Sequence, residues 1–445
     1  MIYTLANVFK KYTEIGFYKN LSANVLILVL NTLTGLVAAR ALQPQGRGIQ
    51  AAIVMWPQFF AYTFTFGVST AIIYRLNTDR TGHQVAVGTS LMLSILYGIL
   101  AASIGFLCLP FILKNYSSEA IFYAQLMMIF VPLVLINTTL TDIMQAKQDY
   151  NMLSVSRFVG PLISLFLLYT MYLLNFINPY RASLAILLPN VLLLMGNIIW
   201  LRIAIPGRLS VSLVECRRIT ALGIKFYGSH LIGTVSDQVD RIIVIGFLST
   251  VDLGYYGIAL SLSRVLNAVQ TATTMSILPK IINKSDESIK STLKRAFILT
   301  LSLSLFVGLV MVATSRFLIS TFFGPSYLNA VSSYDILVAE AILLGCTNVI
   351  AQFFMAKGRP QINTYIISIA FIIGVPFMFW FSRIYGLIGV SFGLLLITSI
   401  RLLSTGILFI WFTKFQLKNN TRKLLIQIDR FENEKSRYLE AKSDE

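Results

Sequence analysis

The chain has 445 residues, of which 56% are apolar and only 12% are charged. Soluble globular proteins are typically about 45–50% apolar and about one quarter charged, so this composition excludes an ordinary soluble domain and indicates a bilayer environment. Lys and Arg outnumber Asp and Glu by 36 to 19, a formal net charge of +17, but the basic residues lie in short segments between apolar stretches, which is typical of a membrane protein and not of a nucleic-acid-binding one.

The apolar stretches predict an all-α, polytopic membrane protein. A span needs roughly 20 apolar residues to cross about 30 Å of hydrocarbon. About twelve segments meet this requirement, and in chain order they are 21–39, 50–74, 85–110, 119–141, 152–175, 183–203, 223–248, 254–278, 295–318, 333–356, 362–382 and 385–413.

The loops between these segments predict the orientation and the domains. About 27 of the 36 Lys and Arg residues fall on the side that also carries both termini, and about six fall on the opposite side. Because basic loops stay in the cytoplasm, we expect both termini there. The expected parts are an N-terminal six-helix bundle (1–207), a basic cytoplasmic connector (208–222), a C-terminal six-helix bundle (223–413) and a cytoplasmic amphipathic tail (414–445).

Two pairs of short motifs indicate an internal repeat. Residues 146–151 (AKQDYN) precede the fifth span as residues 356–361 (AKGRPQ) precede the eleventh, and Gly46-Arg47-Gly48 precedes the second span as residues 254–257 (GYYG) open the eighth. Both offsets are about 210 residues, which is the length of one six-helix half. A repeat of six spans keeps its orientation, so we expect a parallel 6+6 repeat around a central cavity, an architecture typical of transporters.

Six charged residues lie well inside the predicted spans, away from the span ends, where each costs roughly 2.5–3.5 kcal/mol on insertion scales. They are Asp237, Asp240, Arg241, Arg264, Glu340 and Arg401. Uncharged polar residues recur on several of the predicted spans, and the ones that we expect to face the cavity are Asn31, Gln58, Asn267 and Asn348. Polar stripes on several spans predict one shared, water-filled cavity.

The charged residues differ in how readily a structural role explains them. Asp237 and Arg241 stand four residues apart and could neutralise each other, and Glu340 could reach the headgroups. Arg401 lies near the middle of its span with no acid within a turn, which makes it the best functional candidate. Arginine offers a planar, permanently charged fork of donors that suits phosphate, so the cavity favours an anionic cargo. Arg47, near the outer mouth, is explained by interfacial anchoring.

Motifs for catalysis or cofactors are absent from the sequence. It contains no GxxxxGK[ST] nucleotide loop and no HExxH zinc motif, so neither direct ATP drive nor enzymatic activity is expected. Its three cysteines are widely spaced and it has only two histidines, so no metal site is expected. The carboxylates in the spans leave H⁺ or Na⁺ coupling open.

Three segments of the sequence contain motifs that stand in a characteristic order. The first is ARALQPQGRG at residues 39–48, followed by Trp56-Pro57. The second runs from Asp237 to Pro279 and includes Asp240-Arg241 and the Gly254-Tyr255-Tyr256 motif. The third is the AKGR turn at residues 356–359. In this order, and along nearly the whole chain, the motifs resemble the polysaccharide repeat-unit flippases of the multidrug/oligosaccharidyl-lipid/polysaccharide exporter superfamily.

The resemblance implies a twelve-helix fold of two bundles that works by alternating access in a bacterial inner membrane. The cargo would be an undecaprenyl-pyrophosphate-linked oligosaccharide, turned from the cytoplasmic to the outer leaflet, with the polysaccharide polymerase and chain-length machinery as partners. The cations that would bind its phosphates are Arg401, Arg264 and Arg241. The acids that would bind a coupling ion or pair with these arginines are Asp237, Asp240 and Glu340.

Two other functions stay open at this point. A cation-coupled multidrug antiporter of the same superfamily would use carboxylates on helices one, seven and ten, but the first span here carries Asn31 in place of an acid. A non-transporting assembly partner of the glycosyltransferases and polymerase would depend on the charged tail after Lys414 and not on the cavity.

Overall fold

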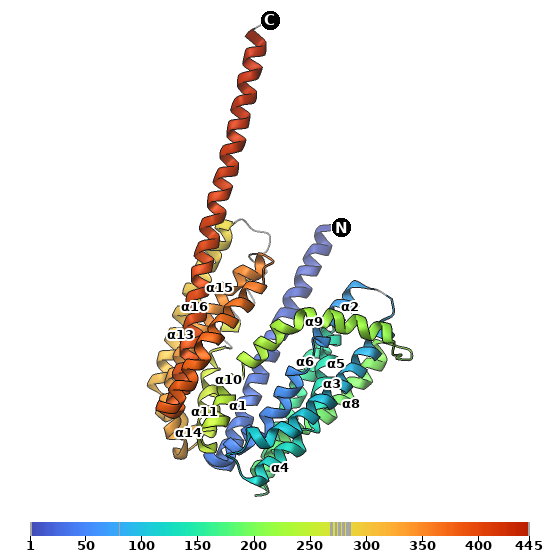
Figure 1. Ribbon diagram of the computed structural model, residues 1–445, viewed down its shortest axis with the longest axis vertical. Coiled ribbons are helices and arrows are strands. Elements are labelled where there is room, and N and C mark those ends of the chain that lie inside the picture. The colour runs from blue at the N-terminus through green and yellow to red at the C-terminus, as the bar shows by residue number, and fades with distance from the viewer. Residues whose placement is uncertain are drawn as a thin grey trace.

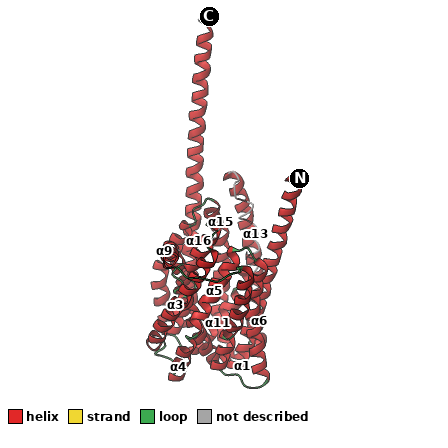
Figure 2. Ribbon diagram, turned by 90° about the vertical axis from the view of Figure 1, so that its right-hand side faces the viewer, coloured by secondary structure: helices red, strands yellow, loops and turns green. Residues whose placement is uncertain are grey.

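The computed structural model describes residues 2–443, apart from Arg80 and residues 268–269, 272–273, 275–276, 278–280 and 282–285, and it describes side chains only between residues 26 and 413, without 286–287. Within these limits the regular structure is entirely helical, as Figure 2 shows. The all-α prediction is therefore confirmed.

Eight helices form the first half of the chain. They are α1 (Ile2–Thr63), α2 (Val68–Thr78), α3 (His83–Ile112), α4 (Ser118–Met127), α5 (Phe130–Ala146), α6 (Tyr150–Leu173), α7 (Pro179–Leu187) and α8 (Pro189–Ala204).

The second half begins with α9, inside the segment 208–222 that was predicted as a connector. Its described elements are α9 (Leu213–Ser236), α10 (Val239–Phe247), α11 (Thr250–Ser263), α13 (Asp286–Ala313), α14 (Ser315–Phe322), the 3₁₀ helix η1 (Pro325–Ala330), α15 (Val331–Ala356) and α16 (Gln361–Ser443). The predicted tail from residue 414 continues α16 as a helix, and its side chains lie outside the described residues.

Polar side chains fix the first turns of several helices. Ser117, Asp149 and Asn178 each accept a hydrogen bond from the backbone N–H three residues further on. Ser249 and Asp252 form a reciprocal capping box at the start of α11. Each cap satisfies backbone donors that a helix end otherwise leaves unpaired, so these side chains set where the segments begin.

Two helices turn back on themselves at residues with positive φ. The kink in α1 lies at Gln43 (φ 57°), directly before Pro44, and the kink in α16 lies at Gly386 (φ 57°). Eight helices in the described residues are long and apolar enough to span a membrane, and two of them are the doubled segments Leu26–Thr63 and Gln361–Thr413. Dividing these two at their kinks, and adding the broken helix α9–α10 and α11, accounts for the twelve predicted segments within the described residues, while part of the predicted span 254–278 lies outside them.

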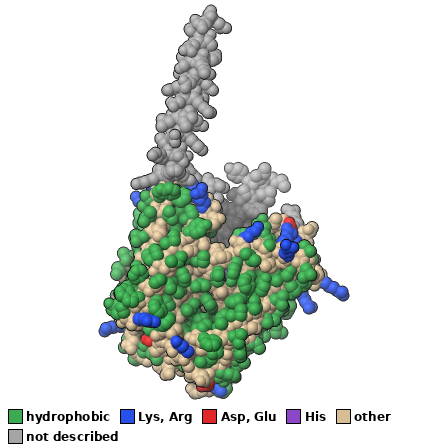
Figure 3. Space-filling view, in the orientation of Figure 1, with side chains coloured by type: hydrophobic (Ala, Val, Ile, Leu, Met, Phe, Trp, Pro, Cys, Tyr) green, Lys and Arg blue, Asp and Glu red, His purple; other side chains and the backbone are tan. Residues whose placement is uncertain are grey.

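The helices form two groups that correspond to the two halves of the sequence. Figure 1 shows the blue-to-green first half beside the second half, with the N and C labels at the same end of the molecule. An even number of spans requires this arrangement of the termini. Figure 3 shows apolar side chains over the middle of one face, with Lys and Arg toward its two ends, as expected for a protein embedded in a bilayer.

The halves meet most extensively where α1 packs against α11, at the end opposite the termini. Here backbone touches backbone: a Cβ on Gly48 would lie 1.7 Å from the Thr250 carbonyl oxygen, and a Cβ on Gly254 would lie 2.1 Å from that of Pro44. Only glycine allows so close an approach. The two motifs of the predicted repeat, around Gly48 and Gly254, thus pack on each other.

Side-chain hydrogen bonds extend this contact. Arg40 donates to the carbonyl oxygens of Thr321 and Phe322, and the Tyr327 hydroxyl donates to the Ala39 carbonyl oxygen at 3.0 Å. We call residues 39–48, together with 250–254 and 321–327, the interhalf seal. It packs the two halves together at the end far from the termini.

Helix α9 belongs to the second half by sequence, yet its first turns pack on the first half. Glu215 accepts from Arg75 Nε on α2 at 2.6 Å, and Tyr227 donates to the Thr63 carbonyl oxygen at 2.7 Å. Ile219 joins an apolar cluster with Val68 and other residues of α2 and α3. The first part of α9 therefore bridges the two halves near the termini.

The buried Arg75–Glu215 pair gives a stability prediction. Replacing Glu215 with Ala leaves the Arg75 side chain, which is only 8% exposed, with Asp79 as its remaining ion-pair partner. Breaking a buried pair typically costs 3–5 kcal/mol, so we expect a loss of about 3 kcal/mol because Asp79 is retained. Thermal unfolding in detergent measures this. The control is Arg218→Ala, whose half-exposed pair with Asp79 is expected to contribute at most about 1 kcal/mol, and an equal effect of both changes would contradict the prediction.

Candidate functional site

A cavity of about 450 Å³ lies within the second half, between α10, α11, α15 and α16, and we call it the central cavity. Its lining brings together the six charged residues that lie well inside the predicted spans, which are Asp237, Asp240, Arg241, Arg264, Glu340 and Arg401. Asn267 and Asn348 line it as well. Residues far apart in the sequence thus form one polar chamber in a segment of the molecule that crosses the membrane.

Helix breaks place the charged residues in this cavity. Helix α9 ends at Ser236 and α10 begins at Val239, so Asp237 and Gln238 lie in the gap between them. Arg264 occupies the C-cap of α11, where that helix is interrupted. Inside a membrane, irregular backbone is tolerated only where protein buries it or where it lines a cavity, and broken helices at this depth characteristically mark binding sites of transporters.

Glu340 is the best-coordinated acid of the central cavity. It is 1% exposed, its Oε2 lies 2.9 Å from Arg264 Nη1, and its Oε1 accepts a hydrogen bond from the Thr398 hydroxyl at 2.8 Å. The alternative that Glu340 reaches the headgroups is therefore wrong. Its carboxylate instead joins α11, α15 and α16 through one ion pair and one hydrogen bond.

The local pair that the sequence allowed between Asp237 and Arg241 does not form. Arg241 Nη1 donates to Gln238 Oε1 at 3.1 Å, because the break between α9 and α10 removes the helical spacing that an i, i+4 pair needs. Asp240, which is 4% exposed, accepts a hydrogen bond from Tyr256 at 2.6 Å. The central cavity therefore holds three arginines and three carboxylates, a formal charge of zero, and is not a purely cationic chamber.

Arg401 differs from the other arginines of the central cavity. The ion pairs found in the described part of the chain do not involve it, and its Nε is buried without a hydrogen-bond partner. A guanidinium without an ion-pair partner, whose buried Nε has an unused donor, favours an acceptor-rich, negatively charged ligand.

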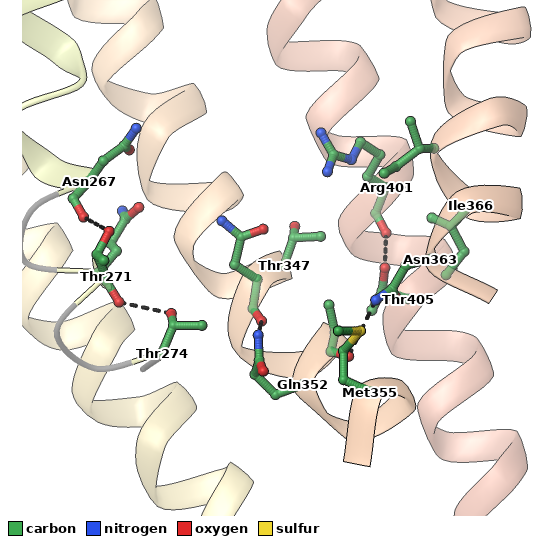
Figure 4. A pocket seen from close by; sticks show the side chains of 14 residues that line it. Asn267, Thr271, Thr274, Thr347, Gln352, Met355, Asn363, Ile366, Arg401 and Thr405 are labelled. Atoms are coloured by element: carbon green, nitrogen blue, oxygen red, sulfur yellow. Dashed lines mark hydrogen bonds between the residues drawn. The ribbon is translucent and has the colours of Figure 1, made fainter. Parts of the chain in front are cut away.

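A second cavity of about 450 Å³ adjoins the first, and we call it the amide cavity. The two share Asn267, Asn348, Ile367 and Arg401. Its further polar lining is uncharged and consists of Gln270, Thr271, Thr274, Thr347, Gln352, Asn363 and Thr405. Figure 4 shows Arg401 on α16 across the pocket from Asn267, Thr271 and Thr274, with Thr347 and Gln352 between them. Arg401 thus stands where a charged chamber meets an amide- and hydroxyl-lined one.

Two predicted cavity residues lie elsewhere. Gln58 lines a third cavity of about 180 Å³ between the halves, which we call the interhalf cavity, together with Arg47 and Arg241. Asn31 is exposed and lines none of these three cavities.

Arg47 is the side chain that sequence reasoning missed. It was explained as an interfacial anchor, but the kink at Gln43 starts the second crossing at Pro44, so Arg47 lies inside the molecule. No sequence signal announces a positive φ at Gln43, since glutamine rarely adopts it. The adjacent GRG motif was nevertheless a usable signal, because paired glycines permit close helix contact.

Comparisons with known proteins agree with this architecture. A family model described as polysaccharide biosynthesis protein matches residues 37–332, more than half of the chain. No curated protein sequence matches.

Among solved structures, an inward-facing multidrug resistance MATE family transporter of the MOP superfamily is 16% identical with a TM-score of 0.71, covering 89% of this chain and 96% of its own. The lipid II flippase MurJ in an inward closed conformation is 14% identical with a TM-score of 0.72, covering 86% of this chain and 85% of its own. A MOP superfamily transporter from Pyrococcus furiosus is 16% identical with a TM-score of 0.60, covering 90% and 94%. At these identities the likeness establishes the fold. The chain belongs to the polysaccharide biosynthesis protein family and has the two-bundle fold of the MOP superfamily.

Proposed function

We propose that this protein is a flippase that moves undecaprenyl-pyrophosphate-linked oligosaccharide repeat units from the cytoplasmic to the outer leaflet of a bacterial inner membrane. The observation that carries the proposal is the position of Arg401, which has no ion-pair partner in the described part of the chain and lies where the central and amide cavities join. Family membership supports a role in polysaccharide synthesis, and the fold is that of transporters.

The two cavities match the two polar parts of such a substrate. A diphosphate is an acceptor-rich anion that the Arg401 fork binds by charge-assisted hydrogen bonds. Sugars are uncharged and rich in hydroxyls, and the amide cavity offers amide and hydroxyl groups such as Asn348, Gln352 and Asn363. We assign the diphosphate to the junction at Arg401 and the sugars to the amide cavity, while the polyprenyl chain stays in lipid.

The remaining charges of the central cavity suit ion coupling. Arg264 is already neutralised by Glu340, so its contribution to phosphate binding, like that of Arg241, depends on rearrangement of this network. Asp237 lies at the break between α9 and α10, and protonation or Na⁺ binding there would change the charge balance between Asp237, Arg264 and Arg401. In this proposal a coupling ion alters how strongly the arginines hold the cargo.

The interhalf seal supports alternating access as the mechanism. The halves are packed at the end opposite the termini, and with the termini in the cytoplasm we infer that the cargo enters the cavities from the cytoplasmic side. Rocking the halves about the cavity would open the seal and close the other end.

Deletion of the gene in its bacterial host tests the function directly. We expect loss of surface polysaccharide and accumulation of lipid-linked repeat units in the cytoplasmic leaflet, because their polymerisation requires delivery to the outer one. Measuring polymer and the leaflet distribution of the intermediates checks this. Restoration by the wild-type gene is the control. Intact polymer with altered resistance to cationic drugs would instead establish the multidrug antiporter.

A further inference from the structure

Arg47 and Gln50 form a pair of buried, under-used donors in α1, just after its kink. Arg47 Nη1 donates to Gln50 Oε1, which occupies the acceptor of that amide. Arg47 Nε and Gln50 Nε2 are then buried without a partner, and Gln50 is 0% exposed. Arg47 forms none of the ion pairs found between described residues. A buried cation without a counter-charge is costly, so this arrangement favours the binding of an anion.

The interhalf cavity beside this pair has a net positive lining, whereas the charges that line the central cavity sum to zero. Arg47 and Arg241 both line it, and its described lining contains no Asp or Glu. Asp240, the nearest acid on α10, is held by the Tyr256 hydroxyl. The volume of about 180 Å³ corresponds to roughly six water molecules, so it accommodates a phosphate group.

The two arginines come from different halves. Arg47 lies on α1 in the first half and Arg241 lies on α10 in the second, and the cavity between them adjoins the interhalf seal. Arg241 also lines the central cavity, so the two chambers are neighbours. Arg47 and Arg241 therefore share one cavity only as long as the two halves are packed together at the interhalf seal.

We propose that the interhalf cavity is a second phosphate subsite, in which Arg47 and Arg241 bind the diphosphate of the lipid-linked substrate before the seal opens. This rests on the proposed flippase function and adds a station separate from Arg401. Because the two cations belong to different halves, opening the seal separates them and weakens their joint hold on the diphosphate. The subsite thus binds tightly in the state described here and releases its ligand as the opposite side opens.

Binding to the purified full-length protein in detergent tests this subsite. The probes are undecaprenyl pyrophosphate, undecaprenol as its uncharged counterpart, and inorganic pyrophosphate, with the shift in thermal unfolding giving the apparent Kd. We expect undecaprenyl pyrophosphate to stabilise the wild type, undecaprenol to have no comparable effect, and Arg47→Ala to raise the Kd for undecaprenyl pyrophosphate at least tenfold. Arg47→Gln keeps a long polar side chain without the charge and should show the same loss, which guards against misfolding of the alanine variant.

Arg383→Ala is the matched control, because Arg383 stacks on Phe247 and Phe379 and lines none of the three cavities. Tight binding by both Arg47 variants would overturn the subsite while leaving the flippase intact. Failure of the wild type to bind the lipid diphosphate, together with no translocation in reconstituted vesicles, would overturn the proposed function instead. If inorganic pyrophosphate bound as tightly as undecaprenyl pyrophosphate, and if this binding also depended on Arg47, the site would recognise a soluble diphosphate. That outcome would overturn the assignment of the subsite to the lipid-linked substrate.

Discussion

Replacing Arg401 with alanine is expected to abolish surface polysaccharide while the protein remains in the membrane at wild-type amounts. The side chain has no ion-pair partner among the described residues and stands at the junction of the two cavities, so its removal breaks no observed ion pair. What is lost is the charge-assisted hydrogen bonding to the diphosphate, where one such contact is worth about 1.5–3 kcal/mol and a bidentate pair more. We therefore expect transport to fall at least tenfold.

The measurement is complementation of a deletion strain, with polymer analysis and a membrane immunoblot. Arg401→Lys keeps the charge but not the planar fork, so partial activity is expected from it. Arg316→Ala, an arginine outside the described cavities, serves as the control and should complement fully. Normal polymer from Arg401→Ala would remove Arg401 from the mechanism.

Adding a single methyl group at Gly48 is expected to block transport by preventing closure of the interhalf seal. A Cβ there would lie 1.7 Å from the Thr250 carbonyl oxygen, and the contact is with backbone, so no side chain can rotate away. Overpacking typically costs 1–3 kcal/mol, and about 2 kcal/mol shifts an equilibrium between closed and open seal roughly 30-fold. Gly48→Ala should therefore populate the state in which the halves separate at this end.

Accessibility of an introduced thiol measures the state of the seal. In a variant with the three native cysteines replaced, Ser326→Cys is expected to react faster with a membrane-impermeant maleimide when Gly48→Ala is also present. The matched control is Gly196→Ala, because a Cβ at Gly196 meets no atom within 4 Å. Unchanged labelling and transport in Gly48→Ala would show that the seal tolerates the methyl group and is not a gate.

The sequence predicted the spans and the gathering of charge for clear physical reasons. Apolar length is dictated by bilayer thickness, and the twelve predicted segments correspond to the described helices once α1 and α16 are divided at their kinks. Ionisable groups inside spans must face protein or water, and Asp237, Glu340, Arg401 and the other three line one cavity. Both inferences use only the cost of exposing polar groups to lipid.

Which charged residues pair within the site could not be predicted from the sequence, because the pairing depends on where the helices break. An uninterrupted helix would have placed Asp237 beside Arg241, whereas the interruption between Ser236 and Val239 gives Arg241 to Gln238. Likewise the kink at Gln43 moves Arg47 from the expected interface into the molecule. Helical periodicity predicts neighbours only as far as the helix continues.

The packing of α9 on the first half has a consequence for how the molecule moves. The repeat in the sequence divides the chain near the segment 208–222, but Glu215 and Tyr227 fasten the beginning of α9 to α2 and α1. The backbone first becomes irregular again at Asp237 and Gln238, between α9 and α10. If the halves move against each other as proposed, the boundary between the moving parts therefore lies later in the chain than the boundary of the predicted repeat, and the pivot falls among the charges of the central cavity. In that proposed mechanism, a change of ligand or ion at Asp237 acts at the pivot, so a small displacement there moves the far end of the second half by a larger distance.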